Sequence, residues 1–294
     1  YVTRAILTII AAIFSFSLMG VAVRILTADY SIFQISFTRN FFGFLPILLL
    51  LAYSKQMGAL KTPFNRQEWM ICALRGGSVS LAQLCLFTAY SKLEFATVAT
   101  LAFSGPFFVT AISVPLLGAV VGFWRWSAVI LGFCGVVMIM QPGASIFSLF
   151  SLLPVLAALC YAMSSTLVKI FSVDRLSGVI QFRSQIFAAG FSLLLWLSFS
   201  EMVPIASAFD LGLFLALGLL GGAGVLGLVV AYRMSQPSLL APFEYFGIPF
   251  SMFLGWWFFA EAPLDRLFPG VLAIIAGGLL IIWRQARIQT DPPR

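Results

Sequence analysis

Glu244 is the residue whose type and position most clearly suggest chemistry. It lies within an apolar stretch of the chain and is the only acidic residue deep inside such a stretch. A carboxylate in hydrocarbon costs about 3 kcal/mol or more, so we expect it to face protein or a wet cavity. There it can contact a substrate ammonium group or carry a coupling proton. The alternative is a structural ion pair with Arg39, Arg75 or Arg183.

Two prolines, Pro106 and Pro249, are predicted to interrupt membrane-spanning helices at near-equivalent places. Proline frees the carbonyl group four residues earlier, here those of Ala102 and Tyr245. Freed carbonyls and half-helix N-termini can bind the ammonium and carboxylate groups of a substrate near the bilayer midplane. We therefore assign both prolines to gating. Kinks that only shape helix packing are the alternative.

Small, hydroxyl-bearing and aromatic side chains recur at helical spacing in several apolar stretches. Converging groups of this kind suit an amphipathic amino acid. The substrate-binding candidates that join Glu244 are Tyr245, Ser80, Gln83, Tyr90, Thr100, Ser104, Ser15, Tyr161 and Ser164. Close packing of small residues between helices is the competing explanation.

The elements that must position these residues are membrane helices. The chain is 61% hydrophobic and 9% charged, with a mean hydropathy of +1.05, whereas soluble proteins carry about 25% charged residues. A soluble enzyme and a nucleic-acid-binding module are therefore excluded. The predicted spans are Ala5–Leu26, Ile32–Tyr53, Trp69–Tyr90, Phe95–Leu117, Trp124–Met140, Ser151–Phe171, Gly178–Phe199, Leu211–Tyr232, Leu239–Ala260 and Leu267–Trp283.

The residues that many enzymes and metal sites require are missing from the sequence. It contains no histidine, and its four cysteines include no C-x-x-C pair, so His-based acid–base chemistry and metal sites are not expected. There is no P-loop, so ATP-driven pumping would need a partner chain. We predict a protein that is not an enzyme, with no cofactor and no metal.

The distribution of basic residues predicts that both termini are cytoplasmic. With the N-terminus inside, eleven of the seventeen Lys and Arg residues fall on the inner side. Two of them, Lys92 and Arg266, fall outside, and four lie within or at the edge of spans. This bias follows the positive-inside rule. We expect a multi-pass protein of a bacterial inner (plasma) membrane, whose partners are the lipid bilayer and a small-molecule substrate.

The two halves of the chain resemble each other in the same order. The matched segments are 33–43 with 180–190, 89–90 with 231–232, 103–105 with 245–247 and 135–137 with 277–279. Each half holds five spans, an odd number, so the second half is predicted to be inverted. We divide the chain into residues 1–143 and 144–294, an all-α integral membrane fold of ten helices in two inverted five-helix repeats. That arrangement is typical of secondary transporters that work by alternating access.

At these positions the sequence resembles the drug/metabolite transporter (DMT) superfamily, EamA type. The matching residues are Ala89, Tyr90, Lys92, Ala96, Ala99, Pro106 and Gly135 in the first half, and Ala231, Tyr232, Ala241, Pro249, Glu261, Gly270 and Gly277 in the second. Ala119 stands where the family has a glutamate, so any role of that glutamate rests on Glu261. The resemblance implies a path lined by spans one, three, four, six, eight and nine, with spans five and ten peripheral.

The resemblance also implies a function. The family commonly exports amino acids or related metabolites, and the many Phe and Trp residues favour the aromatic amino-acid exporter branch. We therefore expect a secondary active transporter that exports amino acids or related small metabolites, with a proton as a candidate coupling ion. The alternatives are another DMT-type carrier, for nucleotide-sugars or drugs and cations, an intramembrane enzyme, or a scaffold.

Overall fold

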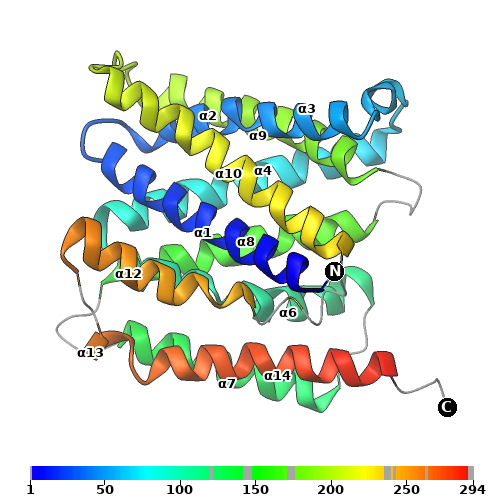
Figure 1. The fold of residues 1–294 in the computed structure, drawn as a ribbon, viewed down its shortest axis with the longest axis vertical. Coiled ribbons are helices and arrows are strands. Elements are labelled where there is room, and N and C mark those ends of the chain that lie inside the picture. The colour runs from blue at the N-terminus through cyan, green and yellow to red at the C-terminus, as the bar shows by residue number, and fades with distance from the viewer. Residues whose placement is uncertain are drawn as a thin grey trace.

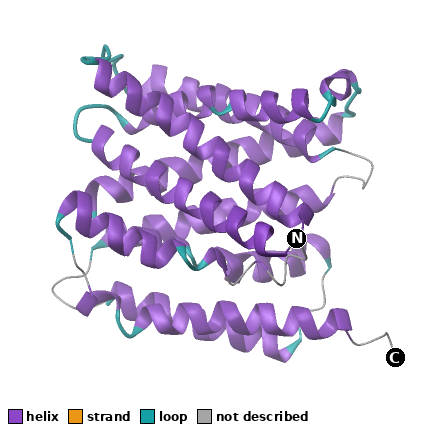
Figure 2. Ribbon diagram, viewed as in Figure 1, coloured by secondary structure: helices purple, strands orange, loops and turns teal. Residues whose placement is uncertain are grey.

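The fold is described from a computed structural model, in which the described residues are helices joined by loops and turns, with no strand among them (Figure 2). The described residues are 2–118, 122–141, 148–170, 176–234, 240, 243–261 and 264–290. The predicted boundary between the two halves, at residues 143 and 144, lies outside this part of the chain, as do Ala119 and Ala241.

The described helices account for the predicted spans. They are α1 (Val2–Leu26), α2 (Ile32–Phe42), α3 (Phe44–Tyr53), η1 (Met57–Lys61), α4 (Arg66–Lys92), α5 (Phe95–Ala102), α6 (Gly105–Leu117), α7 (Phe123–Met140), η2 (Leu149–Ser151), α8 (Leu152–Leu167), η3 (Val168–Ile170), α9 (Ser177–Phe199), α10 (Ala208–Met234), α12 (Gly247–Phe259), α13 (Leu264–Leu267) and α14 (Gly270–Thr290). In the described part, seven segments are long and apolar enough to cross a membrane, and three shorter apolar helices accompany them. The prediction of an all-α membrane fold is confirmed.

The second predicted span is not one continuous helix. It is divided at Gly43, whose N–H donates to the carbonyl of Arg39 at 2.9 Å as α2 ends. Pro46, in the first turn of α3, has no N–H to donate to the carbonyl of Phe42. The aligned residue of the second half, Gly190, lies inside the uninterrupted helix α9. The predicted span Ile32–Tyr53 is therefore found with its predicted bounds, but its helix is interrupted at Gly43.

The fourth span is divided at Phe103–Ser104, between α5 and α6. Pro106 lies in the first turn of α6, where its missing N–H costs no helical bond. Pro249 has a similar place as the third residue of α12, after a turn at Tyr245–Phe246. Both prolines therefore begin helices rather than bend them. The two turns meet inside the bundle, because the ring centroids of Phe103 and Tyr245 are 5.7 Å apart.

The helices lie side by side, with the start of α1 and the end of α14 at the same end of the bundle (Figure 1). Helix α1 packs on α10, and α4 packs on α8. Helix α4 also packs on α9, and α10 packs on α2. Each span has a predicted equivalent five spans away in the other half. Replacing both helices of a pair by their equivalents converts the α1–α10 pair into the α8–α4 pair, and the α4–α9 pair into the α10–α2 pair. The packing is the pattern that two related halves would produce.

Helices α7 and α14, the fifth and tenth spans, pack on each other at one edge of the bundle (Figure 1). Their backbones touch through glycine. A Cβ atom added at Gly135 would lie 2.6 Å from the carbonyl oxygen of Gly270, and one at Gly270 would lie 2.6 Å from that of Gly135. Two helices can approach this closely only where neither residue has a side chain.

We predict that Gly135→Val separates α7 from α14. Overpacking of a close contact costs about 1–3 kcal/mol, so the variant should unfold at a lower temperature in detergent micelles. Gly77→Ala is the matched control, since a Cβ there meets nothing within 4 Å. If Gly135→Val and Gly77→Ala unfold at the same temperature, the contact between α7 and α14 is not tight.

Candidate functional site

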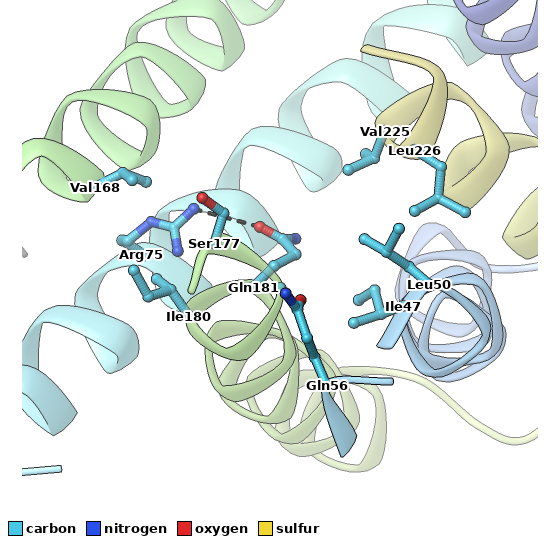
Figure 3. Close-up of a pocket in the computed structure, with 11 residues that line it drawn as sticks. Ile47, Leu50, Gln56, Arg75, Val168, Ser177, Ile180, Gln181, Val225 and Leu226 are labelled. Carbon is cyan, nitrogen blue, oxygen red and sulfur yellow. Dashed lines mark hydrogen bonds between the residues drawn. The ribbon is translucent and has the colours of Figure 1, made fainter. Parts of the chain in front are cut away.

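A cavity of about 110 Å³ lies between α3, α4, η3, α9 and α10 (Figure 3). It is placed towards the end of the bundle where α1 begins and α14 ends, because α3 ends and α9 begins there (Figure 1). One wall is apolar and includes Ile47, Leu50, Val225 and Leu226. The polar groups at the cavity come from Gln56, Arg75, Ser177 and Gln181.

Arg75 is the charged residue of the cavity and is held by two other helices. Its side chain comes from α4 and is only 7% exposed. The Nε–H group donates to the carbonyl of Ser164 at 2.9 Å, and Nη1 donates to the hydroxyl of Ser184 at 2.7 Å. Nη2 approaches Oε1 of Gln181 at 3.4 Å. These contacts fix the guanidinium group between α8 and α9.

A second arginine, Arg39 of α2, is half-buried. Its Nη1 donates to Oδ1 of Asn40 at 3.2 Å, and it is within electrostatic range of the Tyr161 phenol. A Cβ atom at Gly221 of α10 would lie 3.2 Å from its Nε. Gly221 precedes the cavity residue Val225 by one helical turn, about 6 Å along the axis. Arg39 therefore lies about one helical turn along α10 from the cavity residue Val225.

The polar stripe predicted on the third span faces other helices. Gln83 and Asn40 form a reciprocal amide pair, with Nε2 of Gln83 to Oδ1 of Asn40 at 3.0 Å and the return bond at 2.9 Å. Ser36 also donates to Oε1 of Gln83 at 2.8 Å. The Ser80 hydroxyl donates to the carbonyl of Ala188 in α9 at 2.9 Å. Ser80 and Gln83 thus join α4 to α2 and α9.

The hydroxyl groups predicted on the first and fourth spans bond to their own helices. Ser15 donates to the carbonyl of Ala11, Thr100 to that of Ala96 and Ser104 to that of Leu101. Tyr90 stacks on Phe95 at a centroid distance of 5.1 Å, and Tyr161 packs against the same hydrophobic cluster.

The two candidates on the ninth span differ in burial. Tyr245 is buried beside Phe103, and a Cβ at Gly278 of α14 would overlap its hydroxyl. Glu244 is half-buried, between Phe243, which packs near α1 and α10, and Tyr245, which packs near α7 and α14. None of the ten predicted substrate-binding residues lines the cavity, although Ser164 reaches Arg75 through its carbonyl.

The sequence interpretation missed Arg75, Gln181 and Gln56 as cavity residues. It considered Arg75 as an ion-pair partner of Glu244, whereas the contacts in the structure are to Ser164, Ser184 and Gln181. One signal was available, since four arginines lie within or at the edge of the spans and Glu244 is the only acidic residue deep in one. Given that imbalance, a buried arginine such as Arg75 could have been considered as a residue that faces a substrate path.

Arg183 has a structural role at the same end of the bundle. It donates to the carbonyls of Leu60 and Thr62, in and after η1. Its guanidinium carbon lies 3.7 Å from the ring centroid of Phe64 and 4.9 Å from that of Trp69. The arginine thus anchors the segment between α3 and α4 to α9.

An ion pair joins helices at the opposite end (Figure 1). Arg24, at the end of α1, forms a two-point contact with the carboxylate of Glu261, with Nη1 2.9 Å from Oε2. The same Oε2 accepts a hydrogen bond of 2.7 Å from the backbone N–H of Phe95, at the start of α5. Arg24 also lies 4.4 Å from the ring centroid of Phe259. Three spans are tied together at this end.

Among the described residues, seven helices long enough to span a membrane and three shorter apolar helices form the bundle. A cavity with a buried guanidinium group lies between some of them, which is the architecture of a multi-pass membrane protein. The sequence model of the EamA-like transporter family matches residues 3–141. The chain is 30% identical to the pseudopaline exporter CntI of Pseudomonas aeruginosa, over 94% of this chain and 93% of that protein. The chain belongs to the EamA-like transporter family, which confirms the resemblance seen in the sequence.

Other relatives are named for the transport of different compounds. The chain is 28% identical to a riboflavin transporter of Rhizobium johnstonii, over 99% of this chain and 94% of that protein. It is 27% identical to an S-adenosylmethionine uptake transporter of Rickettsia conorii, over 87% and 84% of the two chains. A crystal structure with 18% sequence identity superimposes with a TM-score of 0.67, covering 98% of this chain and 99% of the other, so the fold is shared.

We predict that Gln83→Leu destabilises the protein by removing the amide pair with Asn40. Interhelical hydrogen bonds in membranes are worth about 0.6–2 kcal/mol, so the free energy of unfolding should fall by roughly this amount. Thr88→Val is the control, because that hydroxyl bonds to Leu84 of its own helix. Unchanged stability of Gln83→Leu would reopen a substrate-binding role for Gln83.

Proposed function

We propose that this chain is a gradient-driven carrier that moves a small metabolite by alternating access between two inverted halves, residues 1–143 and 144–294. The observation that carries the proposal is the difference between the two ends of the bundle. A cavity lies near one end, while the Arg24–Glu261 pair joins α1 to the segment after α12 at the other. This is the arrangement of a carrier that is closed on one side.

The orientation is part of the proposal. With both termini in the cytoplasm of a bacterial cell, the cavity belongs to the inner side and the ion pair to the outer side. The pairs of helices related by exchange of the two halves support an inverted repeat. Such halves can rock about the crossing of their broken helices, where Phe103 meets Tyr245, and Pro106 and Pro249 start the outgoing segments.

The substrate that we propose is amphipathic, because the cavity has an apolar wall and a polar side. The sequence predicted the outward transport of amino acids, including aromatic amino acids. Riboflavin, pseudopaline and S-adenosylmethionine, the compounds named for the relatives, are the other candidates. One relative is named an exporter and another an uptake transporter, so direction must be measured.

Glu244 is the residue that we propose for ion coupling or for contact with a substrate ammonium group. It is half-buried near the crossing of the broken helices, one residue before the turn at Tyr245–Phe246. A carboxylate in that place can change its charge as the surroundings open and close.

We predict that proteoliposomes containing the protein exchange at least one compound from a panel of amino acids, riboflavin and S-adenosylmethionine. Glu244→Gln should reduce that flux roughly tenfold, a loss of about 1.4 kcal/mol, with an unchanged unfolding temperature. The neutral amide can neither carry a proton nor pair with an ammonium group. Glu201→Gln is the control, since Glu201 is exposed between α9 and α10.

Flux measured with and without a pH gradient separates the two roles of Glu244. If Glu244→Gln still exchanges substrate but no longer responds to the pH gradient, Glu244 couples transport to protons. If the exchange itself is lost, Glu244 contacts the substrate. The absence of flux for every compound would contradict the proposed function, and full flux in Glu244→Gln would remove this residue from the path.

We predict that Glu261→Gln opens the outer end, because it removes the charge that holds Arg24 and weakens the bond to Phe95. The measurement is labelling of a single cysteine, Leu93→Cys in a cysteine-free background, by a membrane-impermeant maleimide. Leu93 is buried near this end, and its labelling rate should rise roughly tenfold for a loss of about 1.4 kcal/mol. Glu94→Gln is the control, because its carboxylate accepts a hydrogen bond from the nearby hydroxyl of Thr97. Equal rates would show that the pair does not restrain opening.

A further inference from the structure

Arg75 is a buried cation whose partners carry no opposite charge. Its guanidinium group contacts a carbonyl, a hydroxyl and an amide oxygen, and among the described residues no carboxylate is paired with it. An arginine remains charged under all physiological conditions, and leaving a buried charge uncompensated is costly. Charged residues at membrane depth normally pair or face the path of a substrate. The cavity beside Arg75 is the place from which a counter-charge can come.

The guanidinium group also keeps donors for a ligand. Of its five N–H groups, three make the contacts to Ser164, Ser184 and Gln181, and the last of these is long at 3.4 Å. One N–H remains on each terminal nitrogen, which is the fork that a carboxylate or phosphate accepts in a two-point contact. In Figure 3 this end of Arg75 points towards Gln181 and Ser177 at the cavity.

The start of α9 is a second, independent feature of the same cavity. The helix is 23 residues long, and its N-cap residue, Leu176, supplies no side-chain cap. Ser177 and Gly178, its first two residues, line the cavity. Their N–H groups have no partner within the helix, and the positive end of the helix dipole lies with them. Uncapped helix N-termini of this kind bind anions.

We propose that the cavity binds the oxyanion of a metabolite, a carboxylate or a phosphate group, between Arg75 and the N-terminus of α9. The apolar remainder of the ligand lies against Leu50 and Val225 on the facing wall. This inference rests on the proposed function, because it assigns the chemical class of the cargo. The phosphate of an acidic lipid has the same chemistry, and the experiment separates the two sources.

The test compares matched acids and amides in nanodiscs of phosphatidylcholine. The probes are 3-phenylpropionate with 3-phenylpropionamide, and phenyl phosphate with phenol, and the readout is Kd from tryptophan fluorescence. Charge-assisted hydrogen bonds are worth about 1.5–3 kcal/mol, so at least one anion should bind roughly ten- to hundredfold more tightly than its neutral partner. Arg75→Gln should bring that ratio to about one without changing the affinity for the neutral probe.

Two further variants keep the test decisive. Arg75→Lys retains the charge but not the fork, so it should preserve part of the preference, even if Arg75→Gln folds poorly. Lys61→Gln removes an exposed charge of η1 near the same end and should leave the ratio unchanged. A preference for the anion that survives in Arg75→Gln, or falls equally in Lys61→Gln, overturns the proposal.

A lipid source is examined by repeating the measurement in phosphatidylglycerol nanodiscs and by mass spectrometry of retained lipid. Retention of phosphatidylglycerol that depends on Arg75, without an acid preference in phosphatidylcholine, assigns the oxyanion to a lipid headgroup. If neither retention of phosphatidylglycerol nor a preference for the acid is observed, the proposed site is overturned. Transport of a neutral compound without any acid preference would refute this inference alone, whereas anion binding without flux of any compound would refute the proposed function alone.

Discussion

The hydrocarbon interior of a bilayer offers no hydrogen-bond partner to a charged or polar side chain, and the internal organisation of this protein follows from that constraint. Arg183 bonds to backbone carbonyls in and after η1, Arg24 bonds to Glu261, and Gln83 bonds to Asn40. Each of these polar groups therefore draws together elements that are distant in the sequence. Arg75 satisfies its hydrogen bonds in the same way, but its charge is not matched by an acidic partner among the described residues.

The helices were predictable because hydropathy alone determines which segments can enter a bilayer. The predicted spans agree with the described helices, and the breaks were partly predictable, since Pro106 and Pro249 marked two of them. The break at Gly43 was missed because Gly43 aligns with Gly190, which does not interrupt α9. The two halves differ three residues later, where the first half has Pro46 and the second half has Leu193. A proline near the end of an apolar run was too weak a signal to divide the span.

The cavity was not predictable, because helical spacing shows which residues share a face but not what that face meets. Ser80 and Gln83 share a polar face of α4, as expected, yet that face meets α2 and α9. Arg75 reaches the cavity through contacts with Ser164 and Ser184, which lie 89 and 109 residues further along the chain. No local pattern contains such pairings, so they required the packed structure.

The interruption between α2 and α3 has no equivalent in α9, so the two halves are not structurally identical. A carrier built from two identical halves would have two open states of equal energy. If the two halves exchange roles as proposed, a state that flexes at Gly43 and a state that flexes α9 would differ in energy, and we expect different half-saturation concentrations for substrate on the two faces of the membrane. The gradient reached at equilibrium does not depend on this difference, but the speed of transport in each direction at low substrate does.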